Sequence, residues 1–214
     1  MPNCHNLASS IVLDMLSPEG GAIVGTAQTL SRSMVLRESS PEHWDEADFR
    51  GIFQQHYARI VDILVRLLGD RGRADEVAND AFWRLYRQPA LRTDGNVGGW
   101  LYRTATNLGI DALRMSRRRR QHEEAAGRIT QANVQDGPLE DLLREETCRS
   151  VRKVLALLKP AQAQLLILRS AGLSYKEIAD ALEVKATSVG TMLNRAEEEF
   201  RNRYVELHPD EEEL

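Results

Sequence analysis

Cysteines and long apolar runs are scarce in this chain of 214 residues. The two cysteines, Cys4 and Cys148, have the spacing of neither a metal site nor a secreted disulfide framework, so we expect free thiols in the cytoplasm. No apolar run reaches the roughly 18 residues that a membrane span requires, so we expect no membrane insertion. The start of the chain lacks the basic segment and continuous apolar core of a signal peptide, so we expect none there.

Residue patterns that carry catalysis are missing as well. The five histidines are scattered, and none stands in an HExxH pattern or beside a cysteine at ligand spacing. The sequence has no phosphate-binding GxxxxGK[ST] loop and no GxSxG nucleophile turn. We therefore expect a protein that is not an enzyme and that holds neither a metal nor a cofactor.

Charge is plentiful but unevenly distributed. The whole chain has a formal net charge of -4. Residues 49–120 contain 14 basic against 7 acidic residues, whereas residues 121–214 contain 12 against 18 and residues 1–48 contain 2 against 7. A basic segment between acidic flanks predicts an anionic partner for the middle of the chain.

From Phe49 onward apolar residues recur at helical spacing, and no alternating strand pattern occurs. The sequence therefore predicts an all-α fold of two small helical domains joined by a flexible linker. The expected inward-facing residues of the first three helices are Phe49, Phe53, Tyr57, Ile60, Leu64, Leu67, Val77, Ala81, Leu85, Leu101, Ala105, Leu108, Ala112 and Met115.

Breaks in this pattern divide the chain. The stretch "GDRG" at residues 69–72 ends the first helix, and Pro89 ends the second. The stretch "QHEEAAGRITQANVQDGP" is polar and has no periodicity, as is typical of a linker. We expect a disordered extension (1–44, of which 1–33 are dispensable), a first domain (45–120), a linker (121–140), a second domain (141–205) and an acidic tail (206–214).

The stretch "LSYKEIADALEVKATSVGTMLNRAEEEF" has the pattern of a helix-turn-helix. Ser174 and Glu177 have capping-box spacing at the start of its first helix. Helical hairpins in bundles can have the same pattern, so the pattern alone leaves duplex binding open. The residues left facing outward, where a DNA major groove could lie, are Lys185, Ser188, Thr191, Asn194 and Arg195.

The stretch "GWLYRTATNLGIDALRMSRRRR" at residues 99–120 predicts a helix with one polar side. Arginines bind phosphates, Asn and Asp can hydrogen-bond base edges, and aromatic rings stack on unpaired bases. A solvated face that ends in a solubilising arginine tail would give the same pattern. The residues on this side are Trp100, Tyr102, Arg103, Asn107, Asp111 and Arg114, followed by the arginine run that includes Arg117 and Arg118.

These segments occur in an order that resembles the successive conserved blocks of a bacterial extracytoplasmic-function sigma factor. The blocks are "FRGIFQQHYARIVDILVRLLGD", "ADEVANDAFWRLYRQ", "GWLYRTATNLGIDALRMSRRRR" and the helix-turn-helix stretch. The resemblance implies an alternative sigma factor that binds core RNA polymerase and directs promoter recognition, DNA melting and transcription initiation. It also implies an anti-sigma factor as a further partner.

The resemblance further implies a role for each matching position. Asp75, Glu76, Asn79, Asp80 and Phe82 would face the polymerase clamp. Trp100, Tyr102, Arg103, Asn107, Asp111 and Arg114 would melt and read the -10 element, with the arginine run on the DNA backbone. Lys185, Ser188, Thr191, Asn194 and Arg195 would contact the -35 element.

This sequence departs from the family pattern at several of these positions. Glu183 stands where the turn usually has Gly, and Lys185 stands where a capping Ser is usual, which would leave the cap to Thr187. Gly190 and Met192 occupy positions that are commonly basic, so we expect weak phosphate attraction by the second domain.

Three other classes of protein compete with the sigma-factor interpretation. A free-standing helix-turn-helix regulator would bind duplex DNA without polymerase, but the polar row from Arg103 to Arg114 would have no role in it. An interaction protein would bind only other proteins, and an enzyme would hold a metal or cofactor.

Overall fold

The computed structural model describes residues 44–88, 91, 95–126 and 139–209. In these ranges the chain is helical and contains no strand. Residues 1–43 of the expected extension (1–44), residues 127–138 of the expected linker and residues 210–214 of the expected acidic tail lie outside the described residues. No helix that the structure describes is both long and apolar enough to cross a bilayer.

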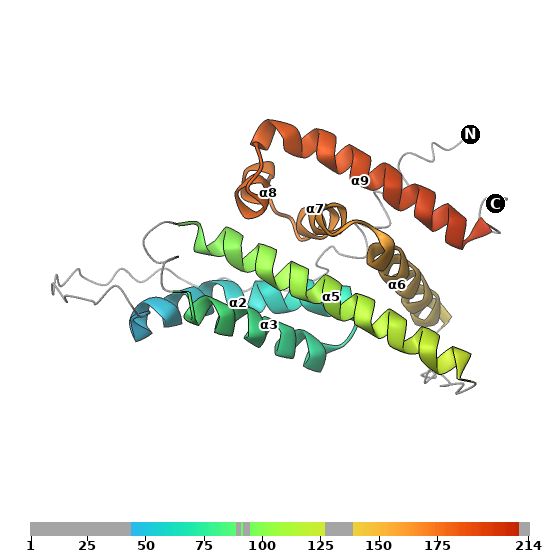
Figure 1. The fold of residues 1–214 in the computed structure, drawn as a ribbon, viewed down its shortest axis with the longest axis horizontal. Helices are drawn as coiled ribbons and strands as arrows, with labels where there is room; N and C mark the ends of the chain where they lie inside the picture. Colours follow the sequence, from blue (N-terminus) through green and yellow to red (C-terminus); the bar gives the residue numbers. More distant parts are fainter. Residues whose placement is uncertain (1–43, 89–90, 92–94, 127–138, 210–214) are drawn as a thin grey trace.

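The first domain consists of α2 (Glu46–Leu68), α3 (Arg71–Tyr86) and α5 (Val97–Ala125), as Figure 1 shows. Gly69 ends α2 with a left-handed φ of 73°, and the Asp70 side chain then accepts the Arg73 amide 2.6 Å away as the N-cap of α3. The break predicted at residues 69–72 is therefore confirmed, and it turns α3 back along α2.

The core of the first domain follows the predicted apolar stripes, with two differences. Ile60, Leu64 and Leu101 are almost fully buried. Met115, predicted to face inward, is 57% exposed. Trp44, predicted to belong to the extension, is 5% exposed and donates its indole N–H to the Leu85 carbonyl oxygen at 2.9 Å, so the folded domain begins no later than this residue.

The second domain consists of α6 (Leu139–Leu157), α7 (Pro160–Ser170), α8 (Tyr175–Leu182) and α9 (Ala186–Leu207). Ser174 and Glu177 form the predicted capping box at the start of α8. Helices α8 and α9 pack against each other and form the predicted helix-turn-helix. Its core contains Ile178, Val189 and Phe200, each no more than 2% exposed.

α5 lies between the two domains. It contacts α2 and α3 on one side and α6, α7 and α8 on the other, as Figure 1 shows. Its buried residues consequently cover about half of the helix circumference, which is more than a single apolar stripe provides. α5 also continues five residues past Arg120 into the stretch predicted as linker, because Gln121 to Ala125 include no helix breaker.

Candidate polymerase and nucleic-acid interface

The residues predicted to face the polymerase clamp lie on α3, and all but one of them reach the surface. Glu76, Asn79 and Asp80 are exposed, while Asp75 is half-buried and accepts the Tyr57 hydroxyl at 3.3 Å. Burial, together with the negative charge of Asp75, raises the pKa of Tyr57. The hydroxyl therefore stays protonated and can act as the donor.

Phe82 is a core residue, which corrects its predicted place on the polymerase face. It is 3% exposed, and its ring packs 4.9 Å from that of Phe53. The next residue, Trp83, is instead 58% exposed and stacks on Tyr86 with ring centroids 5.9 Å apart. Trp83 lies within about 60° of Glu76, Asn79 and Asp80 around the helix, so α3 presents a face with three polar residues and one tryptophan.

The residues predicted to melt and read the -10 element lie along one side of α5, except for Tyr102. Asn107 and Asp111 are exposed, and Trp100 is half-buried. Tyr102 is two positions after Trp100, which places it about 160° away around the helix. Its side chain is 7% exposed and lies in the contact with the second domain. Tyr102 therefore does not share the exposed face with the rest of the row, contrary to the prediction.

Arg103 and Arg114 lie at the edge of this row and contact the second domain. The Arg103 guanidinium forms an ion pair with Glu183 at 2.9 Å. Arg114 donates to the carbonyl oxygens of Leu158 at 2.7 Å and Ala156 at 3.3 Å, at the end of α6. Two arginines that are predicted to bind DNA are thus bonded to groups of the second domain in this structure.

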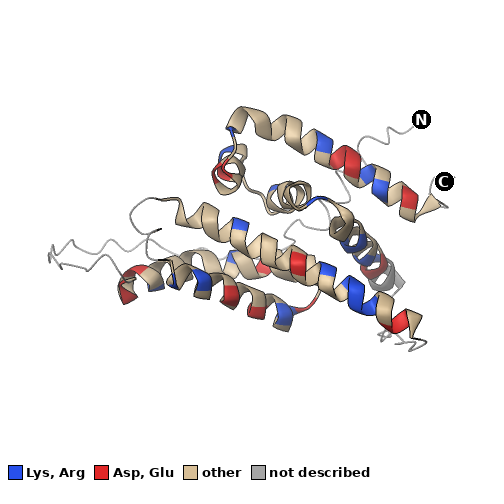
Figure 2. Cartoon of the chain, in the orientation of Figure 1, with Lys and Arg blue, Asp and Glu red and all other residues tan. Residues whose placement is uncertain are grey.

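The arginine run lies near the C-terminal end of α5 and gathers positive charge there, as Figure 2 shows. Arg118, Arg119 and Arg120 are exposed, and Arg117 is half-buried. Burial is the main cause that lowers the pKa of Arg152 on α6, and the nearby charge of Arg120 adds to it. Arg120 lies about 140° from Asn107 around the helix, so the two residues are on different sides of α5.

The predicted -35 residues lie at the start of α9 and on its outer face. Lys185, Thr191, Asn194 and Arg195 are exposed, and Ser188 is half-buried. Lys185 is the N-cap of α9 but makes no side-chain cap hydrogen bond, and Thr187 does not take over that position. Beside this face, a Cβ at Gly190 would lie 3.5 Å from the ring of Tyr175, so the glycine sits against an aromatic side chain.

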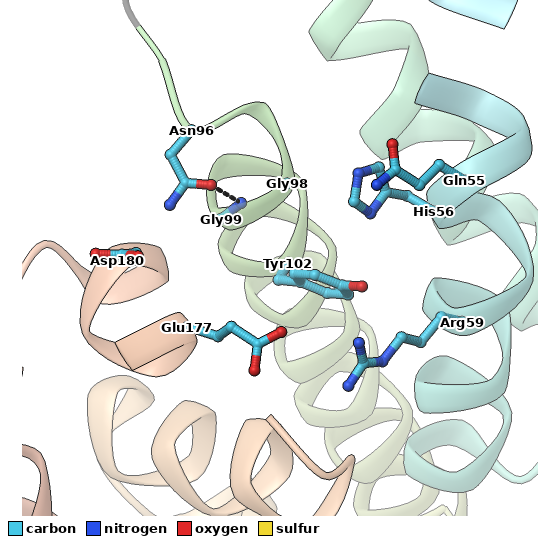
Figure 3. Close-up of a pocket in the computed structure, with 9 residues that line it drawn as sticks. All are labelled: Gln55, His56, Arg59, Asn96, Gly98, Gly99, Tyr102, Glu177 and Asp180. Carbon is cyan, nitrogen blue, oxygen red and sulfur yellow. Dashed lines mark hydrogen bonds between the residues drawn. The ribbon is translucent and has the colours of Figure 1, made fainter. Parts of the chain in front are cut away.

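A cleft of about 260 Å³ lies between the domains, as Figure 3 shows. Arg59 lies over the Tyr102 ring at 5.6 Å from its centroid, and Glu177 of α8 points toward Arg59. Hydrogen bonds within the capping box are the main cause that lowers the pKa of Glu177, and the charge of Arg59 adds to it. Within the described part of the chain, no group of acidic, histidine or cysteine side chains could hold a metal ion.

These features define a helical protein with a helix-turn-helix in its second domain and, in its first domain, a long helix with a basic cluster near its C-terminal end. The family model for sigma-70 region 2 matches residues 52–119, and the model for sigma-70 region 4 matches residues 148–200. The chain belongs to the sigma-70 family, among the extracytoplasmic-function sigma factors.

Several proteins that are similar in sequence to this chain are named as sigma factors of the same family. The chain is 29% identical over 171 residues to the ECF RNA polymerase sigma factor SigE of Mycolicibacterium smegmatis, a match that covers 78% of this chain and 63% of the relative. It is 30% identical to the probable ECF RNA polymerase sigma factor SigI of Mycobacterium tuberculosis (67% and 51%) and 27% identical to SigW of Bacillus subtilis (76% and 92%). The chain thus spans less than two thirds of the length of the first two relatives.

One solved structure is also similar, the co-crystal structure of the sigma factor RpoE with the anti-sigma factor NepR from Bartonella quintana. The TM-score is 0.43 at 20% identity, and the match covers 76% of this chain and 98% of that chain.

Proposed function

We propose that this chain is an alternative sigma factor that binds core RNA polymerase and directs promoter recognition, DNA melting and transcription initiation. The observation that carries the proposal is that one chain presents two separate polar helix faces, each inside a segment that matches a sigma-70 region. One face is the row on α5, and the other is the outer face of α9.

The first domain would supply the polymerase contact and the contact to melted DNA. The exposed face of α3 offers carboxylates and the Trp83 ring to a protein partner, since aromatic anchors are enriched at protein interfaces. On α5, Asn107 and Asp111 would hydrogen-bond base edges, and Trp100 would stack on an unpaired base. The arginines at the end of α5 would bind the backbone next to those bases.

The second domain would place α9 in the major groove of the -35 element. The second helix of a helix-turn-helix docks there with its N-terminal residues toward the bases. Lys185, Thr191 and Arg195 are exposed in that part of α9. Because the face has few cations and Glu198 is also exposed, its grip on phosphate would be weak, and polymerase would hold the domain on the promoter.

The competing function is a free-standing helix-turn-helix regulator, and co-purification with core RNA polymerase separates the two. We expect the chain to bind core polymerase in the absence of DNA and to leave no footprint on a duplex promoter by itself. A footprint by the isolated chain, together with no binding to core polymerase, would favour the regulator instead.

A pair of variants on α3 makes this test residue-specific. Trp83→Ala removes the exposed ring and should weaken core binding, while Gln88→Ala changes an exposed residue past the end of the helix and should leave it unchanged. Equal core binding by both variants would remove Trp83 from the polymerase face.

A further inference from the structure

Of the residues predicted to form the apolar stripe of α5, Met115 alone is exposed, at 57%. Leu101, Ala105 and Ala112 are buried, and Leu108 packs against the core. Single apolar side chains are common on protein surfaces, so exposure alone assigns no role to Met115. The role follows from the neighbours of Met115 on α5.

On the side of the first domain, α3 contacts this part of α5 through a single arginine side chain. Arg73 donates to the Ala112 carbonyl oxygen at 3.3 Å and to the Ser116 hydroxyl. Met115 lies about 60° from Ala112 and about 100° from Ser116 around the helix. It is therefore outside the contact with α3 and on the open side of α5.

On that open side, Met115 lies between residues that are proposed to bind bases and phosphate. Asp111 and Arg118 are both exposed. Around the helix Met115 is about 40° from Asp111 and about 60° from Arg118, and along the axis it is about 6 Å past Asp111 and about 4.5 Å before Arg118. Nucleotides of one strand repeat about every 3.4 Å. A strand that joins a base at Asp111 to a phosphate at Arg118 therefore covers about three nucleotides and passes over Met115.

The chemistry of Met115 fits the part of a nucleotide that its neighbours do not bind. A carboxylate such as Asp111 bonds the polar edge of a base, and an arginine such as Arg118 bonds a phosphate, but neither covers the apolar face of the base. A thioether is polarisable and makes favourable contacts with aromatic rings, and methionine is among the side chains that insert between bases.

A second apolar side chain stands at the other end of the same row. Trp100 is about 22 Å from Met115 along the axis of α5, which corresponds to about six stacked nucleotides. Asn107 and Asp111 lie between them. The row thus has an apolar side chain at each end and polar, base-bonding side chains in the middle.

We propose that Met115 is a further base-contacting residue, whose thioether packs on the face of an unpaired nucleobase at the end of the row opposite Trp100. This inference rests on the proposed function, because it requires single-stranded promoter DNA along α5. It adds a contact that recognises the presence of a base at one position, beside the edge contacts of Asn107 and Asp111.

The test is a scan of single abasic sites along the non-template strand of a promoter fragment with a pre-melted -10 segment. The full chain and core polymerase bind the fragment, and fluorescence anisotropy measures the affinity. An abasic site removes one base and leaves its sugar and phosphate in place. Met115→Gln should weaken binding to the intact fragment by about two- to tenfold, the range for a contact between a thioether and a ring. It should also abolish the effect of the abasic site at one position and keep the effects at the others.

Two matched variants separate a base contact from a general effect of the substitution. Met115→Leu keeps an apolar side chain of similar volume and should bind within about twofold of the unaltered chain, with the abasic effects retained. Leu207→Gln introduces the same polar group at another exposed apolar position, on α9, and should change nothing in the scan. Urea unfolding should be unchanged by Met115→Gln, because the replaced side chain lies mostly in solvent.

Three results would contradict this inference, and one of them concerns the proposed function as well. If Met115→Gln responds to every abasic site as the unaltered chain does, Met115 contacts no base. If Met115→Gln weakens binding to core polymerase without DNA, Met115 belongs to the polymerase contact instead. If the unaltered chain and core polymerase bind no promoter fragment, the proposed function fails and the inference fails with it. The first two results are obtained only with an active complex, so they overturn the role of Met115 alone.

Discussion

Arg118 and Arg119 are neighbours in sequence, but the structure predicts opposite outcomes for their replacement. Both are exposed near the end of α5. Arg118 lies within about 20° of both Asn107 and Asp111 around the helix, whereas Arg119 lies about 120° from Asn107. A strand that follows the Asn107 side therefore meets Arg118 and misses Arg119.

The expected magnitude follows from counterion release. One phosphate contact on single-stranded DNA contributes about 0.7 to the slope of log K against log salt concentration. Arg118→Gln should lower that slope by about 0.7, so that a fourfold rise in salt weakens the unaltered chain about 2.6-fold more than the variant. Arg119→Gln should leave the slope unchanged. Base preference should hold in both variants, because phosphate contacts do not read sequence.

The assay is fluorescence anisotropy of the polymerase complex on a promoter fragment with a pre-melted -10 segment, titrated at several salt concentrations. Unchanged slopes for both variants would show that the arginine run is a solvated tail. Equal decreases would show that the strand does not follow the side of α5 that carries Asn107. Either result would refute the reasoning.

Three further predictions concern packing and the reading of bases. Gly109→Ala should destabilise the fold by about 1–2 kcal/mol, because its Cβ would lie 2.7 Å and 2.8 Å from buried leucine methyls of α2. Gly190→Ala meets only an ordinary contact and should stabilise the fold by up to about 1 kcal/mol. Urea unfolding measures both variants, and a stabilised Gly109→Ala would contradict the packing. Phe82→Ala should cost about 3–5 kcal/mol in the same assay, and a loss under about 1 kcal/mol would contradict its core position. Asn107→Ala should reduce open-complex formation, measured by permanganate reactivity, while core binding is retained; an equal loss of core binding would make Asn107 a structural residue.

Local signals in the sequence were sufficient for the helices and their ends. The apolar stripe from Phe49 to Leu67 predicts α2, "GDRG" predicts its end, and Ser174 with Glu177 predicts the start of α8. Each of these signals acts within a few residues, through side-chain periodicity or a cap, so no tertiary information is needed to interpret it.

The positions of individual site residues were less predictable. The family resemblance places Phe82 on the polymerase face, yet Ala81, Phe82 and Leu85 are all buried and Trp83 is exposed. The resemblance also places Tyr102 on the same face as Trp100, although residues two apart point in different directions on a helix. The helical angle between residues is a signal for both positions, because Trp83 shares its face with Glu76 and Asp80 and Tyr102 is about 160° from Trp100.

The packing of the second domain on α5 could not be predicted from the sequence. It depends on single contacts such as Gln164 with Thr106 and Arg114 with backbone carbonyls, and such contacts leave no periodic pattern. One local feature of the sequence bears on this packing: Glu183 stands where the family pattern has glycine. In the fold, the Glu183 carboxylate pairs with the half-buried Arg103 guanidinium at 2.9 Å.

The central claim is that this chain gives core RNA polymerase the ability to start transcription at specific promoters. In vitro transcription from a library of promoter fragments, with core polymerase in the presence and absence of the chain, tests it most directly. We expect defined transcripts from a subset of fragments only when the chain is present, and none with the chain alone. The same transcripts with core polymerase alone, or none in any combination, would contradict the account.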